Sequence, residues 1–112
     1  MLPKTNCLKK KKDFERVFKK GKGFKEDFLV IRFVPNNQKK SRFGIIISKK
    51  ISKKATIRNK IKRRIRQLLR IRLKEIRKGI DIVLIGVPGL ENKDFWEIEE
   101  VLTNLLKKAK LI

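Results

Sequence analysis

The chain contains no histidine and no tyrosine, and Cys7 is its only cysteine among 112 residues. Histidine is the usual general base near neutral pH and the commonest metal ligand, so its absence removes the Ser-His and Cys-His nucleophile pairs. A single cysteine allows neither an internal disulfide nor a cysteine-rich zinc site, and it fits a reduced compartment. A Gly-rich phosphate loop of the Walker type is also missing. We therefore expect the polypeptide to carry no catalytic group and to bind no metal or cofactor itself.

Long apolar runs and acidic residues are scarce as well. No stretch approaches the ~20 apolar residues of a membrane span, and charges begin at Lys4 where a signal peptide would be apolar. We therefore expect a cytoplasmic protein. Only 11 acids accompany 33 Lys and Arg, which gives a net charge of +22 and a pI near 10.7. Because 40% of the residues are hydrophobic, the chain is expected to fold. Nucleic acid is the favoured partner of such a charge, and an anionic membrane surface is the alternative.

The apolar pattern predicts one domain over residues 1–112, with residues 1–12 basic and loose. It predicts helices over 13–20, 54–77 and 94–110, and strands over 28–34, 42–48 and 81–87. The first helix is expected to be capped by Asp13 and to end at Gly21. The first two strands are expected to be antiparallel neighbours, and the third, apolar throughout, to lie mid-sheet. The fold class is thus α+β, a single-domain sandwich of order α-β-β-α-β-α.

Most of the positive charge falls in residues 49–78, which hold fifteen Lys or Arg and one acid. Six apolar residues of the predicted helix share one arc that would pack on the sheet, namely Ile57, Ile61, Ile65, Leu68, Leu69 and Ile76. A stripe opposite this arc contains Asn59, Arg63, Arg66, Arg70, Lys74 and Arg77. At ~1.5 Å per residue the stripe would run roughly 27 Å, which is several phosphate spacings. Arg72 falls inside the apolar arc.

A solvated helix face would normally mix charge signs, with Glu four residues from Lys. Here like charges stack at i+3 and i+4, at a cost of a few tenths of a kcal/mol per pair. Arginine binds phosphate with two hydrogen bonds and stacks on bases. We therefore interpret the stripe as a nucleic-acid surface.

At these residues the chain resembles the protein subunit of bacterial ribonuclease P. The family signature is an Arg-Asn pair followed by Lys-Arg and another Arg, and here it stands as Arg58-Asn59-Lys60-Ile61-Lys62-Arg63-Arg64-Ile65-Arg66-Gln67, preceded by Ala55. The segment from Asp13 to Gly21 is similar to the family's first helix. The segment from Phe43 to Lys50 is similar to its second strand and the lysines that follow. The resemblance covers nearly the whole chain.

The resemblance implies a ribosomal-protein-S5-domain-2-like fold with a left-handed βαβ crossover. It also implies that a catalytic RNA carries the active site and its magnesium ions, with one protein per catalytic RNA. Together they would remove the 5′ leader of precursor tRNA, as a ribonucleoprotein endonuclease. The catalytic RNA would contact Arg58, Asn59, Lys60, Lys62, Arg63, Arg66 and Arg70. The leader would enter a cleft lined by Phe14, Phe18, Ile31, Lys49 and Lys50, where Ile31 stands in place of the family's tyrosine.

The aromatic residues also have a structural interpretation. Phe14, Val17 and Phe18 share one helix face, which packs in a core more often than it binds RNA. Aromatic rings beside clustered lysines are, however, typical of sites for unstacked single strands. Phe95 and Trp96 are expected in the core. A small basic ribosomal protein, a membrane-surface protein and an independent nuclease remain the alternative functions.

Overall fold

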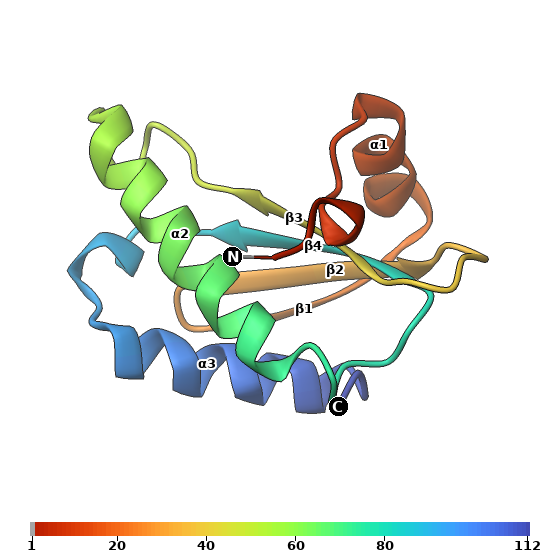
Figure 1. The fold of residues 1–112 in the computed structure, drawn as a ribbon. Coiled ribbons are helices and arrows are strands. Elements are labelled where there is room, and N and C mark those ends of the chain that lie inside the picture. Colours follow the sequence, from red (N-terminus) through yellow and green to blue (C-terminus); the bar gives the residue numbers. More distant parts are fainter. Residues whose placement is uncertain (1) are drawn as a thin grey trace.

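Four strands form one mixed sheet in the computed structural model, which describes residues 2–112 (Figure 1). The strands are β1 (Lys22–Glu26), β2 (Leu29–Pro35), β3 (Arg42–Ile46) and β4 (Ile80–Gly86), in the spatial order β1-β2-β4-β3. β2 is antiparallel to both β1 and β4, whereas β3 is parallel to β4. β4 is central and buried along almost its whole length, which confirms its expected place in the sheet.

The predicted strands 28–34 and 42–48 correspond to β2 and β3. The expectation that these two strands are neighbours is wrong, because β4 lies between them. A strand that is apolar on both faces buries more surface in the centre of a sheet than at its edge. β1 was not predicted either, since Phe24 is its only large apolar residue. It pairs with β2 through a tight hairpin at Asp27, whose positive φ of 49° reverses the chain.

Three helices cover the two faces of the sheet. α1 (Lys11–Lys20) packs on β2 and β4 from one side, while α2 (Ala55–Arg72) and α3 (Phe95–Lys108) cover the other side (Figure 1). Short 3₁₀ helices, η1 (Lys4–Asn6) and η2 (Leu90–Asn92), precede α1 and α3. α2 packs through a row of buried residues, Ile61, Ile65, Leu68 and Leu69.

The ends of α1 and α2 differ from the predictions. α2 ends at Arg72 instead of residue 77, and Arg72 pairs with Glu75 at 3.1 Å and Glu99 at 3.0 Å. These ion pairs account for a cation inside the apolar arc. Asp13 does not cap α1, because the helix begins two residues earlier. Asp94 caps α3 and forms a capping box with Glu97.

The amino-terminal segment, residues 3–10, is not loose as expected but lies along the edge strand β3. The Leu8 backbone N–H donates to the Phe43 carbonyl at 2.8 Å, and the Asn6 side-chain amide donates to the Ser41 carbonyl at 2.7 Å. Leu2 and Leu8 are buried. The segment thus covers an edge that would otherwise be open.

Trp96 contradicts the expectation of a core residue, because 70% of its surface is exposed. Phe95 is half-buried against the core, and the two rings form an edge-to-face pair 5.3 Å apart. The first turn of α3 therefore buries only one of its two aromatic rings.

Candidate RNA-binding surface

The outer side of α2 is a cationic surface, called the α2 surface below. It contains the seven signature-helix residues expected to contact RNA, Arg58, Asn59, Lys60, Lys62, Arg63, Arg66 and Arg70. Four of them, Asn59, Lys60, Arg63 and Arg70, are exposed, and the others are half-buried. Asn59, Lys60, Arg63 and Arg66 line one hollow of about 380 Å³, so the structure brings these four side chains together.

The cations of the α2 surface have no acidic partner within residues 2–112. The ion pairs of this part of the chain use other cations, Arg16, Arg42, Arg72 and Lys93. Arg58 instead donates to the Ser52 carbonyl at 2.8 Å, which ties the start of α2 to the preceding turn. The positive charge of α2 is thus free to act on a partner, and clustered like charge of this density favours a polyanion.

The stripe on α2 is shorter than expected. Lys74 and Arg77 lie beyond the last residue of the helix, in the turns that lead to β4. The helical part, from Asn59 to Arg70, spans about 17 Å at ~1.5 Å per residue. This length still covers two or more phosphate spacings of a nucleic-acid strand.

Phe14 and Phe18 lie on α1, and Phe14 borders a hollow between α1 and α2, whereas Phe18 does not line it. Phe14 is half-buried, and its ring lies so close to Gly44 that a Cβ there would come within 2.4 Å of it. Phe18 is 40% exposed. Phe14, Lys9 and Arg66 line the same hollow of about 310 Å³, which we call the cleft. Arg66 therefore joins the α2 surface to the cleft.

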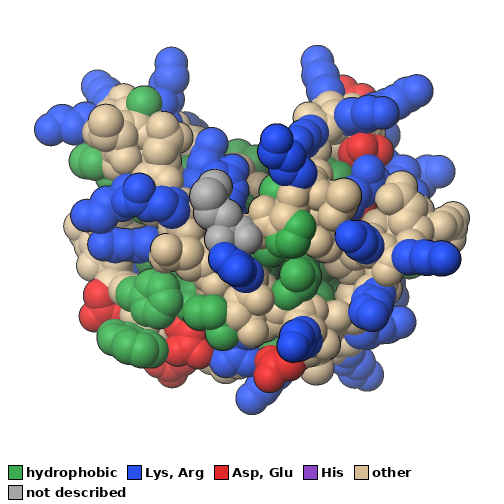
Figure 2. All heavy atoms as spheres, viewed as in Figure 1, with side chains coloured by type: hydrophobic (Ala, Val, Ile, Leu, Met, Phe, Trp, Pro, Cys, Tyr) green, Lys and Arg blue, Asp and Glu red, His purple; other side chains and the backbone are tan. Residues whose placement is uncertain are grey.

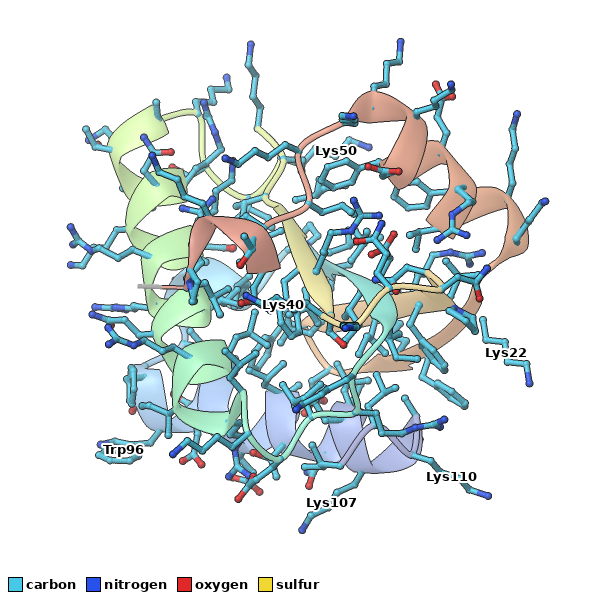
Figure 3. The ribbon with its side chains drawn as sticks, turned by 45° about the vertical axis from the view of Figure 1, so that its right-hand side comes forward. Lys22, Lys40, Lys50, Trp96, Lys107 and Lys110 are labelled. Carbon is cyan, nitrogen blue, oxygen red and sulfur yellow. The ribbon has the colours of Figure 1, made fainter. Side chains whose placement is uncertain are left out.

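Lys and Arg gather on both sides of the cleft. Figure 2 shows basic side chains on the two raised parts of this face, which are α1 and the amino-terminal half of α2. Lys49 and Lys50 are exposed in the turn after β3, and Figure 3 shows Lys50 between these two helices.

The prediction that Ile31 lines the leader cleft is wrong, because Ile31 is fully buried on the face of the sheet that α2 and α3 cover. Neighbouring residues of a strand point to opposite faces, so the next residue of β2, Arg32, faces α1. Arg32 donates to the carbonyls of Phe18 at 2.8 Å and Gly21 at 3.1 Å. Its guanidinium lies 6.0 Å from the centre of the Phe18 ring. The alternation along β2 was the signal that could have identified Arg32.

A buried ion-pair cluster around Asp81 holds α1 on the sheet. Arg42 donates two hydrogen bonds to the Asp81 carboxylate, at 2.8 and 2.7 Å, and Asn36 donates one at 2.9 Å. Two residues of α1 join the cluster, since Arg16 contacts Asp81 and Asp13 contacts Arg42, each at 3.3 Å. Nothing in the sequence distinguished Asp81 from the other scattered acids.

The cluster changes the acid–base properties of its central groups. Burial by itself would raise the pKa of Asp81, but the hydrogen bonds from Arg42 and Asn36 outweigh it and hold the pKa below its usual range. The hydrogen bond to Asp81 likewise raises the pKa of the Arg42 guanidinium. Asp81 is therefore an ionised structural anchor at neutral pH.

Residues 2–112 hold no group of three or more His, Cys, Asp or Glu side chains that could bind a metal ion. Over the same residues, no helix combines the length and the apolar character needed to cross a membrane.

The fold and the unneutralised α2 surface define a small basic RNA-binding protein. A family model described as Ribonuclease P matches residues 2–110. The chain belongs to this ribonuclease P protein family, whose members are subunits of a ribonucleoprotein endoribonuclease. The prediction made from the signature residues is thereby confirmed, and the ribosomal-protein alternative is not favoured.

Individual relatives match this chain in sequence along almost its full length. The ribonuclease P protein component of Clostridium botulinum strain 657 is 38% identical over 107 residues, which cover 95% of this chain and 96% of the relative. That of Thermotoga maritima is 41% identical, with coverage of 92% and 91%.

Solved structures confirm the fold class. The Staphylococcus aureus RNase P protein superposes with a TM-score of 0.88 at 33% identity, covering 95% of this chain and 96% of that one. The Thermotoga maritima RNase P protein gives 0.83 at 40% identity, with coverage of 91% and 96%. The shared topology includes the left-handed crossover from β3 through α2 to β4 (Figure 1).

Proposed function

We propose that the chain binds the catalytic RNA of ribonuclease P through the α2 surface and receives the 5′ leader of precursor tRNA in the cleft. The observation that carries the proposal is the row of α2 cations without an acidic partner within residues 2–112. These cations neighbour a cleft that holds Phe14. A continuous path through Arg66 would let one small protein contact both RNAs at once.

The protein's contribution would be electrostatic. Two folded RNAs repel each other, and a cation-rich protein between them lowers that repulsion and releases condensed counterions. The magnesium ions that the chemistry needs would sit on the catalytic RNA, and the protein would let the reaction run at a lower magnesium concentration. We further propose one protein per catalytic RNA and a cytoplasmic location.

The leader would be held as an unstacked single strand. Such strands bind where aromatic rings offer a stacking surface beside a positively charged groove, and stacking contributes ~1–3 kcal/mol per base. Phe18 offers an exposed ring, Arg32 fixes the carbonyl end of its helix, and Lys49 and Lys50 supply nearby positive charge. The proposed leader site therefore uses Arg32 in place of Ile31.

The first experiment measures leader removal from precursor tRNA by the catalytic RNA of the same organism, with and without the protein. We expect the protein to raise the rate and the precursor affinity and to lower the magnesium requirement. Unchanged values for all three would rule the proposed function out.

The second experiment assigns the surface. Arg63→Ala combined with Arg66→Ala should weaken binding to the catalytic RNA and reduce the slope of log K against log salt by roughly 1.4–1.8, for two lost phosphate contacts. Lys107→Ala combined with Lys110→Ala removes two exposed charges at the end of α3 and serves as the control. An unaltered slope in the arginine variant would remove these residues from the interface.

The third experiment tests the proposed leader site on α1. Phe18→Ala should lower the affinity for precursor tRNA and leave the affinity for mature tRNA, which has no leader, unchanged. Equal losses for both substrates would show that Phe18 acts through the fold and not through the leader.

A further inference from the structure

A second group of lysines surrounds another hollow on the described part of the chain. The hollow measures about 530 Å³ and is bordered by Lys4, Lys9, Lys10, Lys39 and Lys40. Three of these residues belong to the amino-terminal segment, and two belong to the loop between β2 and β3. We call this hollow the lysine track.

The positive charge of the lysine track is not neutralised within residues 2–112. Asp13 is the one acid on its border, and Asp13 is already paired with Arg42 at 3.3 Å. Arg42 in turn is held by the buried Asp81 carboxylate. The five lysines therefore face solvent with no carboxylate of their own.

The fold itself brings these like charges together. The hydrogen bonds from Leu8 to Phe43 and from Asn6 to Ser41 fix the amino-terminal segment beside the loop. The Lys40 ammonium donates to the Thr5 hydroxyl at 3.1 Å, which joins the loop to the segment directly. Gathering cations from distant parts of the chain destabilises the free protein through self-repulsion, and a bound polyanion offsets this cost.

The lining of the hollow indicates which polyanion it fits. No aromatic side chain borders it, so it lacks the stacking surface that single strands require. Lysine is a point charge that binds phosphate, whereas arginine reads base edges with two parallel hydrogen bonds. The lysine track is therefore suited to the phosphate backbone of folded RNA and not to an unpaired leader.

The position of the lysine track separates it from the α2 surface. Lys9 borders both the track and the cleft, so the track begins where the cleft ends. Lys39 and Lys40 also border a further hollow that includes Leu73 and Lys78, just beyond the carboxyl end of α2. The track thus runs around the β3 edge of the sheet, from the cleft to the far end of α2.

We propose that the lysine track is a second binding site for the backbone of folded RNA, distinct from both the α2 surface and the cleft. The proposal rests on the function proposed above, because it assumes a folded RNA partner. The site would lengthen the interface around the edge of the sheet and would contribute affinity without sequence preference.

The test replaces Lys9, Lys39 and Lys40 with Gln in one triple variant. The control triple replaces Lys22, Lys107 and Lys110, which are also exposed and carry the same total charge. Lys22 lies on β1, at the sheet edge opposite β3, and α3 packs beside β1. Figure 3 shows the three control lysines away from Lys40, which lies beside η1. Far-UV circular dichroism and thermal unfolding confirm that both variants fold.

Binding is measured over a range of salt concentrations in two arms. The first arm titrates the catalytic RNA of the same organism, and the second titrates precursor tRNA with the assembled ribonucleoprotein. For the track variant, we expect the slope of log K against log salt to fall by about 2–3, because three phosphate contacts are lost. For the control variant, we expect this slope to fall by less than about one. A loss in the first arm assigns the phosphates to the catalytic RNA, and a loss in the second arm assigns them to the tRNA.

Two results would overturn the proposal. One is a track variant with the wild-type slope in both arms. The other is an equal loss in the track and control variants, which would show that only the overall charge matters. In either case, normal binding by the wild-type protein and a reduced slope for the Arg63→Ala, Arg66→Ala variant would leave the proposed function standing.

Discussion

Asp81→Asn removes the charge at the centre of the cluster that fastens α1 to the sheet. The Asp81 side chain is fully buried and accepts hydrogen bonds from Arg42, Asn36 and Arg16. Asparagine keeps the size of the side chain but presents an amide N–H₂ group where an acceptor is needed. The variant therefore leaves the guanidinium of Arg42 facing a donor.

The expected loss of stability is large for a domain of this size. Breaking a buried ion pair by neutralising one partner costs about 3–5 kcal/mol. Because Arg42 remains partly exposed, at 19%, and keeps its contact with Asp13, we expect the lower part of this range, about 3 kcal/mol. Small domains have a total free energy of unfolding of only about 5–15 kcal/mol.

The loss should depend on pH with a definite sign. The pKa of Asp81 is lower in the folded protein than in the unfolded chain, where it is about 3.9. Its contribution to stability is therefore fully present above about pH 4 and is lost as the pH falls through the lower, folded-state pKa. The difference between wild type and variant should be constant near neutral pH and shrink in stronger acid.

Urea unfolding followed by circular dichroism measures both effects. Glu75→Gln is the matched control, because it makes the same chemical change at an ion pair whose carboxylate is 60% exposed, and it should cost less than about 1 kcal/mol. The Asp81→Asn variant should also lose leader-dependent affinity before it loses binding to the catalytic RNA, since Asp81 holds α1 and not α2. An Asp81→Asn variant as stable as the control would refute the view that this cluster anchors α1.

Other substitutions probe the cleft wall and the last helix. Gly44→Ala would push a methyl group against the Phe14 ring, so we expect a loss of about 1–3 kcal/mol in denaturant unfolding and weaker leader-dependent binding. Wild-type leader dependence in that variant would contradict the placement of Phe14. Asp94→Ala removes the cap of α3 and should cost about 1 kcal/mol by the same measurement. Trp96→Gln should change the unfolding free energy by less than about 0.5 kcal/mol, since the ring is largely exposed, and a larger loss would show that Trp96 packs.

Local sequence patterns correctly predicted the features that depend on a single helix or strand. The apolar arc of residues 54–77 predicted which side of α2 packs, and Ile61, Ile65 and Leu69 are buried as expected. The continuous apolar run of β4 predicted its central place in the sheet. The signature around Arg58 predicted the family, and the matching family model confirms it. Each of these inferences depends on residues that are close in sequence, because helical and strand periods repeat over short distances.

Contacts between distant segments could not be predicted in this way. The insertion of β4 between β2 and β3 depends on which strands meet after the chain has folded. The alternation along β2 puts Ile31 and Arg32 on opposite faces of the sheet, but only the folded sheet shows that the face of Arg32 is the one beside α1.

Some features of the charge distribution follow from the sequence, and others follow only from the tertiary structure. The sequence by itself determined that α2 is apolar on one side and cationic on the other, because that division follows from the helical period alone. Only the tertiary structure decided that Asp81 lies beneath α1 and that the lysines of the amino-terminal segment lie beside those of the loop after β2. Hydrogen bonds between segments more than thirty residues apart, such as the one from Asn6 to Ser41, place these charges, and no local pattern records them.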